Sequence, residues 1–92
     1  MSRPYNDLVT SSEYTIRQFS DSVDPIELMW HRDAEDRVIE SIGETDWKFQ
    51  LDNELPAYIN KPIFIKKYVW HRLIKGSGNL TLMIKKWIYL KY

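Results

Sequence analysis

Short runs in which hydrophobic and polar residues alternate cover most of the chain. The clearest, Trp47-Lys48-Phe49-Gln50-Leu51, puts its hydrophobic side chains on one face of a strand and its polar side chains on the other. Gly, Pro, Asp and Asn residues separate the runs at short intervals, as turn residues do. Strands are predicted on this basis at residues 14–19, 26–32, 37–42, 47–51, 62–66, 70–75 and 80–90.

The run at 80–90 is long enough for a helix, but Leu80, Leu82 and Ile84 alternate with a period of two. Its β-branched and aromatic residues also favour a strand. The pattern therefore predicts an all-β fold, a barrel or sandwich of seven or eight short antiparallel strands. We expect a core that includes Trp47, Phe49, Leu51, Ile63, Ile65, Leu82 and Ile84.

Residues 1–12 are polar and small and lack the alternation, which is typical of a loose arm. We therefore expect an N-terminal arm over residues 1–12 and one β domain over residues 13–92. A chain of 92 residues is close to the lower size limit for a domain with a self-sufficient core.

Composition narrows the class of protein. The chain is 43% hydrophobic and 14% aromatic, which is typical of a globular domain, and it has no cysteine for a disulfide or a thiolate zinc site. The N-terminal residues form no hydrophobic run, and no stretch reaches the roughly 18 hydrophobic residues of a membrane span. We expect a soluble, cytoplasmic protein that does not interact with a membrane.

Charge is balanced overall but divided unevenly along the chain. Residues 1–46 contain four basic and eleven acidic residues, whereas residues 47–92 contain nine basic and two acidic ones. One explanation is that strands from the two halves interleave, so that opposite charges meet across a sheet. The other is a basic face that attracts an anion, built from Lys66, Lys67, Lys85, Lys86 and Lys91.

The tetrapeptide Trp30-His31-Arg32-Asp33 is nearly repeated as Trp70-His71-Arg72-Leu73, and the two tetrapeptides hold both histidines of the chain. In a strand, His31 and Asp33 share one face, and the neighbouring Trp and Arg side chains take the other. If both strands line one barrel, the histidines and Asp33 can converge. Two histidines and one carboxylate suit Fe(II), Mn(II), Ni(II) or Zn(II) and leave coordination positions open. Alternatively, they are ordinary polar members of a barrel wall.

The same residues resemble the signatures of the cupin family. Residues 63–74, IFIKKYVWHRLI, resemble the second signature, Gly-x5-Pro-x-Gly-x2-His, with His71 at the histidine position. The first signature is His-x-His-x3-4-Glu-x6-Gly. There His31 matches the first histidine, Asp33 replaces the second, and Gly43 is close to the final glycine. The resemblance covers roughly residues 28–85 and implies a small cupin barrel with metal ligands at His31, Asp33 and His71.

Three positions depart from these signatures. Lys66 stands in place of the usual proline, and Tyr68 in place of the usual glycine. Arg37 stands at the usual glutamate position, on one of the two alignments that the signature allows. An ion pair between Arg37 and Asp33 would occupy the place of a metal, so the resemblance implies either a divalent metal or a metal-free site filled by Arg37.

Two classes of function follow from the resemblance. In the first, the chain is a metal-binding cupin for a small polar or anionic ligand, which Arg37 or Gln50 orients. A metal-dependent dioxygenase or isomerase is a narrower version of this class, but no general base or nucleophile stands out. In the second, the protein binds a nucleotide or sugar phosphate without metal or catalysis, using Trp70 and Arg72.

A homodimer is the expected assembly, because one small barrel cannot easily bury all its aromatic side chains. Four aromatic side chains and one isoleucine are expected to face away from the barrel interior, namely Trp30, Trp70, Ile74, Trp87 and Tyr89. Residues 1–12 and 80–90 are the segments that two chains could exchange, unless the arm folds back over the rings of its own chain. Nucleic acid is not an expected partner, because no binding motif is present and the net charge is zero.

Overall fold

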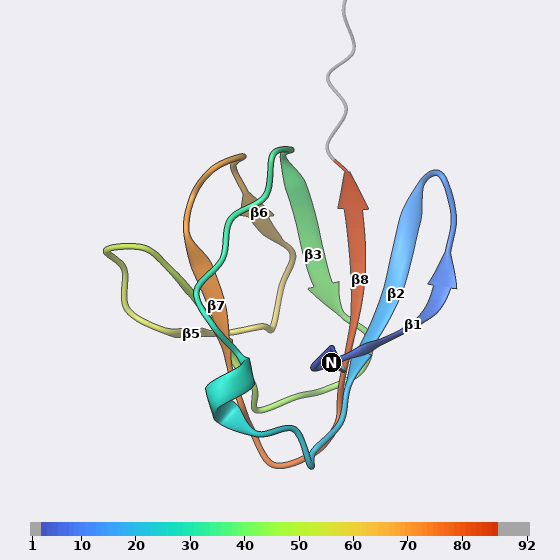
Figure 1. The fold of residues 1–92 in the computed structure, drawn as a ribbon, viewed down its shortest axis with the longest axis vertical. Coiled ribbons are helices and arrows are strands. Elements are labelled where there is room, and N and C mark those ends of the chain that lie inside the picture. Colours follow the sequence, from blue (N-terminus) through green and yellow to red (C-terminus); the bar gives the residue numbers. More distant parts are fainter. Residues whose placement is uncertain (1–2, 87–92) are drawn as a thin grey trace, which may run out of the picture.

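The computed structural model describes residues 3–86 and shows an all-β fold of two antiparallel sheets (Figure 1). The strands are β1 (Asn6–Thr10), β2 (Tyr14–Phe19), β3 (Arg37–Ser41), β4 (Lys48–Leu51), β5 (Ala57–Tyr58), β6 (Ile63–Ile65), β7 (His71–Ile74) and β8 (Leu80–Lys86). The prediction of seven or eight short antiparallel strands is confirmed. Within residues 3–86, no helix is long and hydrophobic enough to cross a membrane.

The two sheets form a sandwich with the core between them. The five-stranded sheet has the order β1-β2-β8-β3-β6, and the three-stranded sheet has the order β5-β4-β7. Strand β8 lies in the middle of the larger sheet, between β2 and β3 (Figure 1). The run from residue 80 is therefore a strand up to residue 86, as predicted, and its remainder lies outside the described residues.

The predicted core residues lie at the interface between the sheets. Trp47, Phe49, Ile65 and Leu82 are buried, and the other three predicted members are partly buried against them. Trp47 is fully buried, and its indole N–H donates a 2.7 Å hydrogen bond to the Gly78 carbonyl oxygen. Further buried side chains complete this core, namely Phe19, Val23, Ile39, Ile59 and Leu80.

The interleaving explanation for the uneven charge is confirmed. Strand β8 comes from the basic half of the chain, and both of its neighbours in the sheet, β2 and β3, come from the acidic half. Lys85 Nζ lies 3.6 Å from a Glu40 carboxylate oxygen, and Lys86 Nζ lies 3.5 Å from a Glu35 carboxylate oxygen. Two of the five lysines proposed for a basic face are thus paired, and Lys91 lies outside the described residues.

The N-terminal segment is not a loose arm over its whole length. Residues 6–10 form β1, an edge strand that pairs with β2 and has an irregular register between Asp7 and Val9. Arg17 on β2 reinforces the pairing, since its Nε donates a 2.7 Å hydrogen bond to an Asp7 carboxylate oxygen. An edge strand needs few hydrophobic side chains, so the alternation that revealed the other strands was absent here.

The strand predicted over residues 26–32 is wrong. A short 3-10 turn occupies Pro25–Glu27, and only His31 pairs with another strand, through an isolated bridge to His71. Asp24 caps the turn by accepting a 3.1 Å hydrogen bond from the Ile26 N–H. Proline at the first position of the turn and an aspartate cap before it favour this conformation over an extended strand.

Candidate metal centre

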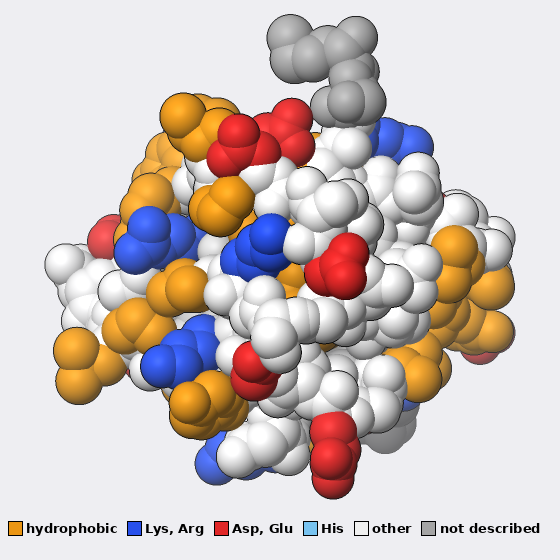
Figure 2. All heavy atoms as spheres, turned by 90° about the horizontal axis from the view of Figure 1, so that it is seen from below, with side chains coloured by type: hydrophobic (Ala, Val, Ile, Leu, Met, Phe, Trp, Pro, Cys, Tyr) orange, Lys and Arg blue, Asp and Glu red, His pale blue; other side chains and the backbone are white. Residues whose placement is uncertain are grey.

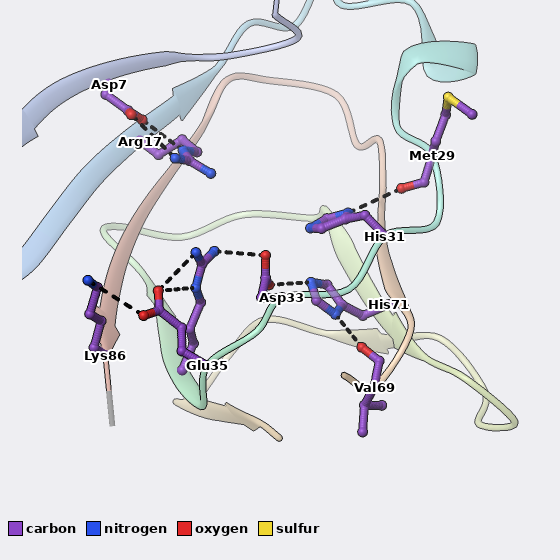
Figure 3. A network of polar contacts seen from close by, with 10 residues as sticks. Asp7, Arg17, Met29, His31, Asp33, Glu35, Val69, His71 and Lys86 are labelled. Carbon is purple, nitrogen blue, oxygen red and sulfur yellow. Dashed lines mark hydrogen bonds and ion pairs between the residues drawn. The ribbon is translucent and has the colours of Figure 1, made fainter. Parts of the chain in front are cut away.

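The two histidines lie side by side because their backbones pair directly. His31 N donates to the His71 carbonyl oxygen at 3.0 Å, and His71 N donates to the His31 carbonyl oxygen at 2.9 Å. Directly opposed residues of an antiparallel pair point to the same face. Their rings accordingly meet, with centroids 4.2 Å apart (Figure 3). The predicted convergence of His31 and His71 is confirmed.

Backbone carbonyls hold both rings in the same way. His71 Nδ1 lies 2.9 Å from the Val69 carbonyl oxygen, and His31 Nδ1 lies 3.3 Å from the Met29 carbonyl oxygen (Figure 3). A carbonyl oxygen can only accept, so the shared hydrogen sits on Nδ1 of each ring. In this tautomer, Nε2 of each ring carries the lone pair that a ligand can use. This arrangement is usual for metal-binding histidines.

Asp33 brings a carboxylate to the same point. Its Oδ2 atom lies 3.4 Å from His71 Nε2, is buried, and has no hydrogen-bond partner among the described residues. Burial is the largest cause and lowers the pKa of His71. The hydrogen bond to Val69 is the next largest and raises the pKa, while smaller electrostatic contributions from His31 and Arg37 lower it and that of Asp33 raises it. A neutral His71 therefore turns the lone pair of its Nε2 atom toward a carboxylate oxygen of Asp33. A cation between these two acceptor atoms would remove their mutual repulsion.

Arg37 binds the other oxygen of the same carboxylate. Its Nη1 atom lies 3.3 Å from Asp33 Oδ1, and its Nη2 atom lies 3.1 Å from a Glu35 carboxylate oxygen (Figure 3). The predicted ion pair between Arg37 and Asp33 is present. It engages Oδ1, however, and leaves Oδ2 directed at His71.

The turn before β7 fixes the backbone of Asp33. Tyr68 N donates a 2.7 Å hydrogen bond to the Asp33 carbonyl oxygen, and Lys67 N donates one of the same length to Asp36 Oδ1. Tyr68 has a φ angle of 63°, in the left-handed region that favours glycine. Tyr68 thus adopts a glycine conformation at the position where the cupin signature has a glycine.

His31, Asp33 and His71 each offer one ligand atom, and these atoms all lie within 4.8 Å of one another. Small side-chain rotations would bring them to the roughly 2.0–2.2 Å metal–ligand distances of first-row divalent ions. No other such group of His, Asp and Glu side chains occurs in residues 3–86. The geometry fits the two-histidine, one-carboxylate arrangement that the sequence predicts.

The three residues open onto a cavity of about 360 Å³ between the sheets. This volume is within the range of small-molecule sites. Most of its wall is hydrophobic, with Leu28, Met29 and Leu73 among the lining residues. Arg37 also lines the cavity.

Gln50, Trp70 and Arg72 do not join the histidines. They lie on the opposite face of the β4–β7 sheet, where Arg72 Nε donates a 2.9 Å hydrogen bond to Gln50 Oε1. Alternate residues of a strand point to opposite faces, so the neighbours of an inward histidine point outward. Gln50 therefore does not lie beside the metal ligands, where it was expected to orient a ligand, whereas Trp70 and Arg72 face away from the histidines, as the alternation predicts.

Arg17 is a further residue of the cavity, and it was not among the predicted site residues. It lines the cavity from β2 and pairs with Asp7. The Cζ atom of its guanidinium lies 3.8 Å from the centroid of the Tyr5 ring. The alternation of β2 contained the signal, because Arg17 shares a strand face with the buried Phe19. Hydrogen bonding to Arg17 is the largest cause that lowers the pKa of Asp7.

Comparisons with known proteins point to one fold. No protein-family model and no curated protein sequence matches the chain. A cupin-2 domain protein from Shewanella frigidimarina has a similar structure, with a TM-score of 0.62, 16% identity, and coverage of 90% of this chain and 79% of that one. A cupin domain protein from Bordetella pertussis has a TM-score of 0.59 and 13% identity, with coverage of 96% and 99%.

A structure of Fe(II) HppE in complex with substrate is also similar, with a TM-score of 0.63 and 18% identity. The match covers 95% of this chain but only 55% of that one, so the chain corresponds to about half of HppE. Identities this low establish the fold alone. With two antiparallel sheets and cupin proteins among its structural neighbours, the chain has the fold of a small cupin.

Proposed function

We propose that the chain binds one divalent metal ion through His31, Asp33 and His71, and holds a small polar or anionic ligand in the cavity beside it. One observation supports this proposal most directly. The buried Oδ2 atom of Asp33 has no hydrogen-bond partner and faces the lone pair of His71 Nε2. A buried acceptor without a partner is costly, and a cation bound by both atoms would remove that cost.

The other residues of the site orient the ligands. The Val69 and Met29 carbonyls keep Nε2 of each histidine directed at the cavity. Arg37 restrains Asp33 by binding Oδ1. A bound divalent ion would supply Lewis acidity and open coordination positions to a ligand donor atom. The comparison with HppE, whose structure is of the Fe(II) form, supports the choice of a first-row metal.

The cavity restricts what the ligand can be. Both guanidinium groups that line it are already paired, Arg17 with Asp7 and Arg37 with Asp33 and Glu35. An anionic group on the ligand would therefore meet the metal rather than an unpaired arginine. The hydrophobic wall would surround the rest of a small molecule and exclude water from the open positions.

Metal titration tests the proposal. The metal-free, untagged chain is titrated calorimetrically with Mn(II), Ni(II) and Zn(II), and anaerobically with Fe(II). We expect a stoichiometry of one for at least one of these ions, and no binding by His71→Ala. Full stoichiometry in His71→Ala would reject the assignment of ligands. Failure of every ion to bind the unaltered chain would reject the metal site.

The alternative is a metal-free binding protein in which Arg37 fills the site, and the Arg37–Asp33 ion pair favours it. Arg37→Gln separates the two functions. If Arg37 positions Asp33 for a metal, the variant binds the ion roughly 10-fold more weakly, as changes around metal ligands do. If Arg37 instead occupies the place of the metal, its removal makes the chain bind the ion more tightly.

A further inference from the structure

The two Trp-His-Arg segments place two tryptophans and two arginines next to one another on the face away from the cavity. Because the histidines pair in antiparallel register, Trp30 lies opposite Arg72, and Arg32 lies opposite Trp70. The Arg72 guanidinium lies 4.8 Å from the Trp30 ring centroid, and the Arg32 guanidinium lies 5.1 Å from the Trp70 ring centroid. Each arginine thus stacks on the tryptophan of the other segment.

The neighbouring strands extend this pattern. Gln50 on β4 accepts a hydrogen bond from Arg72, and Lys48 Nζ lies 4.8 Å from the ring centroid of Tyr58 on β5. Figure 2 shows hydrophobic and basic side chains interleaved over the side of the molecule that carries β5 and β7. We call this surface the outer face, and it consists of Trp30, Arg32, Lys48, Gln50, Tyr58, Trp70 and Arg72.

The rings of the outer face are exposed to solvent. The exposed fraction is 38% for Trp30, 42% for Trp70 and 55% for Tyr58. Aromatic side chains are efficient at burying surface, and three exposed rings on one face of the molecule leave a considerable area available to a partner.

The cations of the outer face have no acidic partner within residues 3–86. Arg32, Lys48 and Arg72 take part in none of the ion pairs there, which use Arg17, Arg37, Lys85 and Lys86 instead. The surface therefore has a local positive charge although the net charge of the chain is zero. A partner with negative charges is complementary to it.

Acidic residues mark one border of the outer face. Asp52 N donates a 2.8 Å hydrogen bond to the Trp70 carbonyl oxygen, and Gln50 Nε2 donates a 2.9 Å hydrogen bond to the Glu54 carbonyl oxygen. Both acids thus lie just beyond the end of β4, and neither carboxylate pairs with a cation of the face. They would repel an anionic partner that extended past this border.

The zero net charge and the lack of a known motif gave no reason to expect nucleic acid as a partner, but they do not describe this local surface. We propose that the outer face binds single-stranded nucleic acid, with bases stacked on its rings and phosphates at Arg32, Lys48 and Arg72. Sheets bind single strands by this combination of aromatic side chains and cations. Strands lie about 4.8 Å apart, and same-face residues of one strand are about 6.7 Å apart, so the face suits two or three nucleotides.

Two other partners fit the surface less well. An acidic peptide would satisfy the three cations but would make no use of the exposed rings. A second copy of the chain, packed face to face, would bring the same unpaired cations against one another, which costs free energy. The proposal does not depend on the metal site, because the outer face and the histidines lie on opposite faces of the paired segments that contain His31 and His71.

The test is fluorescence anisotropy of a labelled oligo-dT of about 12 nucleotides, titrated with the full-length, metal-free chain at several salt concentrations. We expect affinity to fall with salt with a logarithmic slope of roughly −2, as for three phosphate contacts on a single strand. Trp70→Leu should weaken binding about 5- to 150-fold, the loss expected for one stacked base. Trp70→Tyr, which keeps a ring, should retain most of the affinity.

Matched charge variants complete the test. Arg32→Gln should reduce the magnitude of the salt slope by about 0.7, whereas Lys66→Gln removes the same charge away from the face and should leave the slope unchanged. Asp52→Asn should tighten binding. Circular dichroism and thermal unfolding establish whether each variant is folded, and Arg32→Gln decides the outcome if Trp70→Leu does not fold.

Three results would overturn the proposal. The first is no binding of oligo-dT by the unaltered chain at submillimolar concentration and low salt. The second is binding of polyglutamate as tightly as oligo-dT, which would indicate an acidic peptide as partner. The third is a solution mass that halves in Trp70→Leu, which would make the outer face an interface between two copies.

Discussion

The Nε2 atom of His71 lies 3.4 Å from the Oδ2 atom of Asp33, and neither atom carries a hydrogen when His71 is neutral. The Nδ1 hydrogen of His71 is used in the bond to Val69, and burial lowers the pKa of the ring. Two acceptors in this position repel each other. A divalent ion between them would turn that repulsion into two coordination bonds.

Asp33→Asn should abolish the site while leaving the fold intact. An amide keeps the shape of the side chain but loses the negative charge, and changes outside the ligand set already cost 10- to 100-fold in metal affinity. We therefore expect a loss of more than about 100-fold, measured by calorimetric titration with Zn(II). Glu40→Gln, which removes the same charge from an ion pair with Lys85, is the control and should retain the affinity.

The metal-free chain should lose stability in mild acid because of His71. Its folded-state pKa is below the ordinary value of 6.5, so the unfolded chain takes up a proton first as the pH falls. The free energy of unfolding should be highest above pH 6.5 and decrease as the pH falls from 6.5 through the folded pKa. Urea unfolding in the presence of a chelator measures this decrease. His71→Gln should flatten it, and an unchanged pH dependence in that variant would contradict the assignment.

Alternation of side chains predicted the fold well where both faces of a strand differ in polarity. The run from Trp47 to Leu51 is such a case, because one face packs in the core and the other faces solvent. The same rule brought His31, Asp33 and His71 together. Alternation failed to predict β1, because an edge strand needs few hydrophobic side chains. It also failed for the residues before His31, where Pro25 and its aspartate cap form a 3-10 turn instead of a strand.

Pairing between distant strands could not be read from the chain. The stacking of Arg72 on Trp30 depends on the register in which His31 meets His71, and one residue of slip would remove it. Assigning Gln50 to the cavity was an error of another kind. Gln50 follows the buried Phe49 in the same strand, so its side chain points to the other face of the sheet. The period of two was therefore sufficient to exclude Gln50 from the cavity.

Tyr68→Gly should stabilise the chain. Tyr68 adopts a φ angle of 63°, which costs a side chain about 1 kcal/mol relative to glycine, and its ring is 57% exposed, so little burial is lost. We expect a gain of about 0.5–1 kcal/mol in the free energy of unfolding, measured with urea. Asn53→Gly is the matched control, because Asn53 has a φ angle of 62° but asparagine tolerates it. Its gain should be smaller, and a destabilised Tyr68→Gly would refute the argument.

The homodimer predicted from the sequence should form through β1. This strand is at the edge of its sheet and exposes Leu8 and Val9, with exposed fractions of 55% and 43%. Unpaired backbone and exposed hydrophobic side chains at an edge favour pairing with another strand. Light scattering should give about twice the chain mass of 11.1 kDa, and Val9→Lys should restore the single-chain mass. Trp70→Leu, on the outer face, should leave the dimer intact.

Phe49→Ala should destabilise both the core and the metal site. The ring of Phe49 is 4% exposed and stacks on His71, with centroids 5.5 Å apart and planes inclined by 30°. Removing a buried phenylalanine costs about 3–5 kcal/mol, and urea unfolding should show a loss of that size. Leu55→Ala is the control, since Leu55 is 87% exposed and its loss should change stability by less than about 0.5 kcal/mol. Because Phe49 also fixes the orientation of His71, the variant that remains folded should bind Zn(II) more weakly. Unchanged affinity would mean that the hydrogen bond to Val69 alone positions the ring.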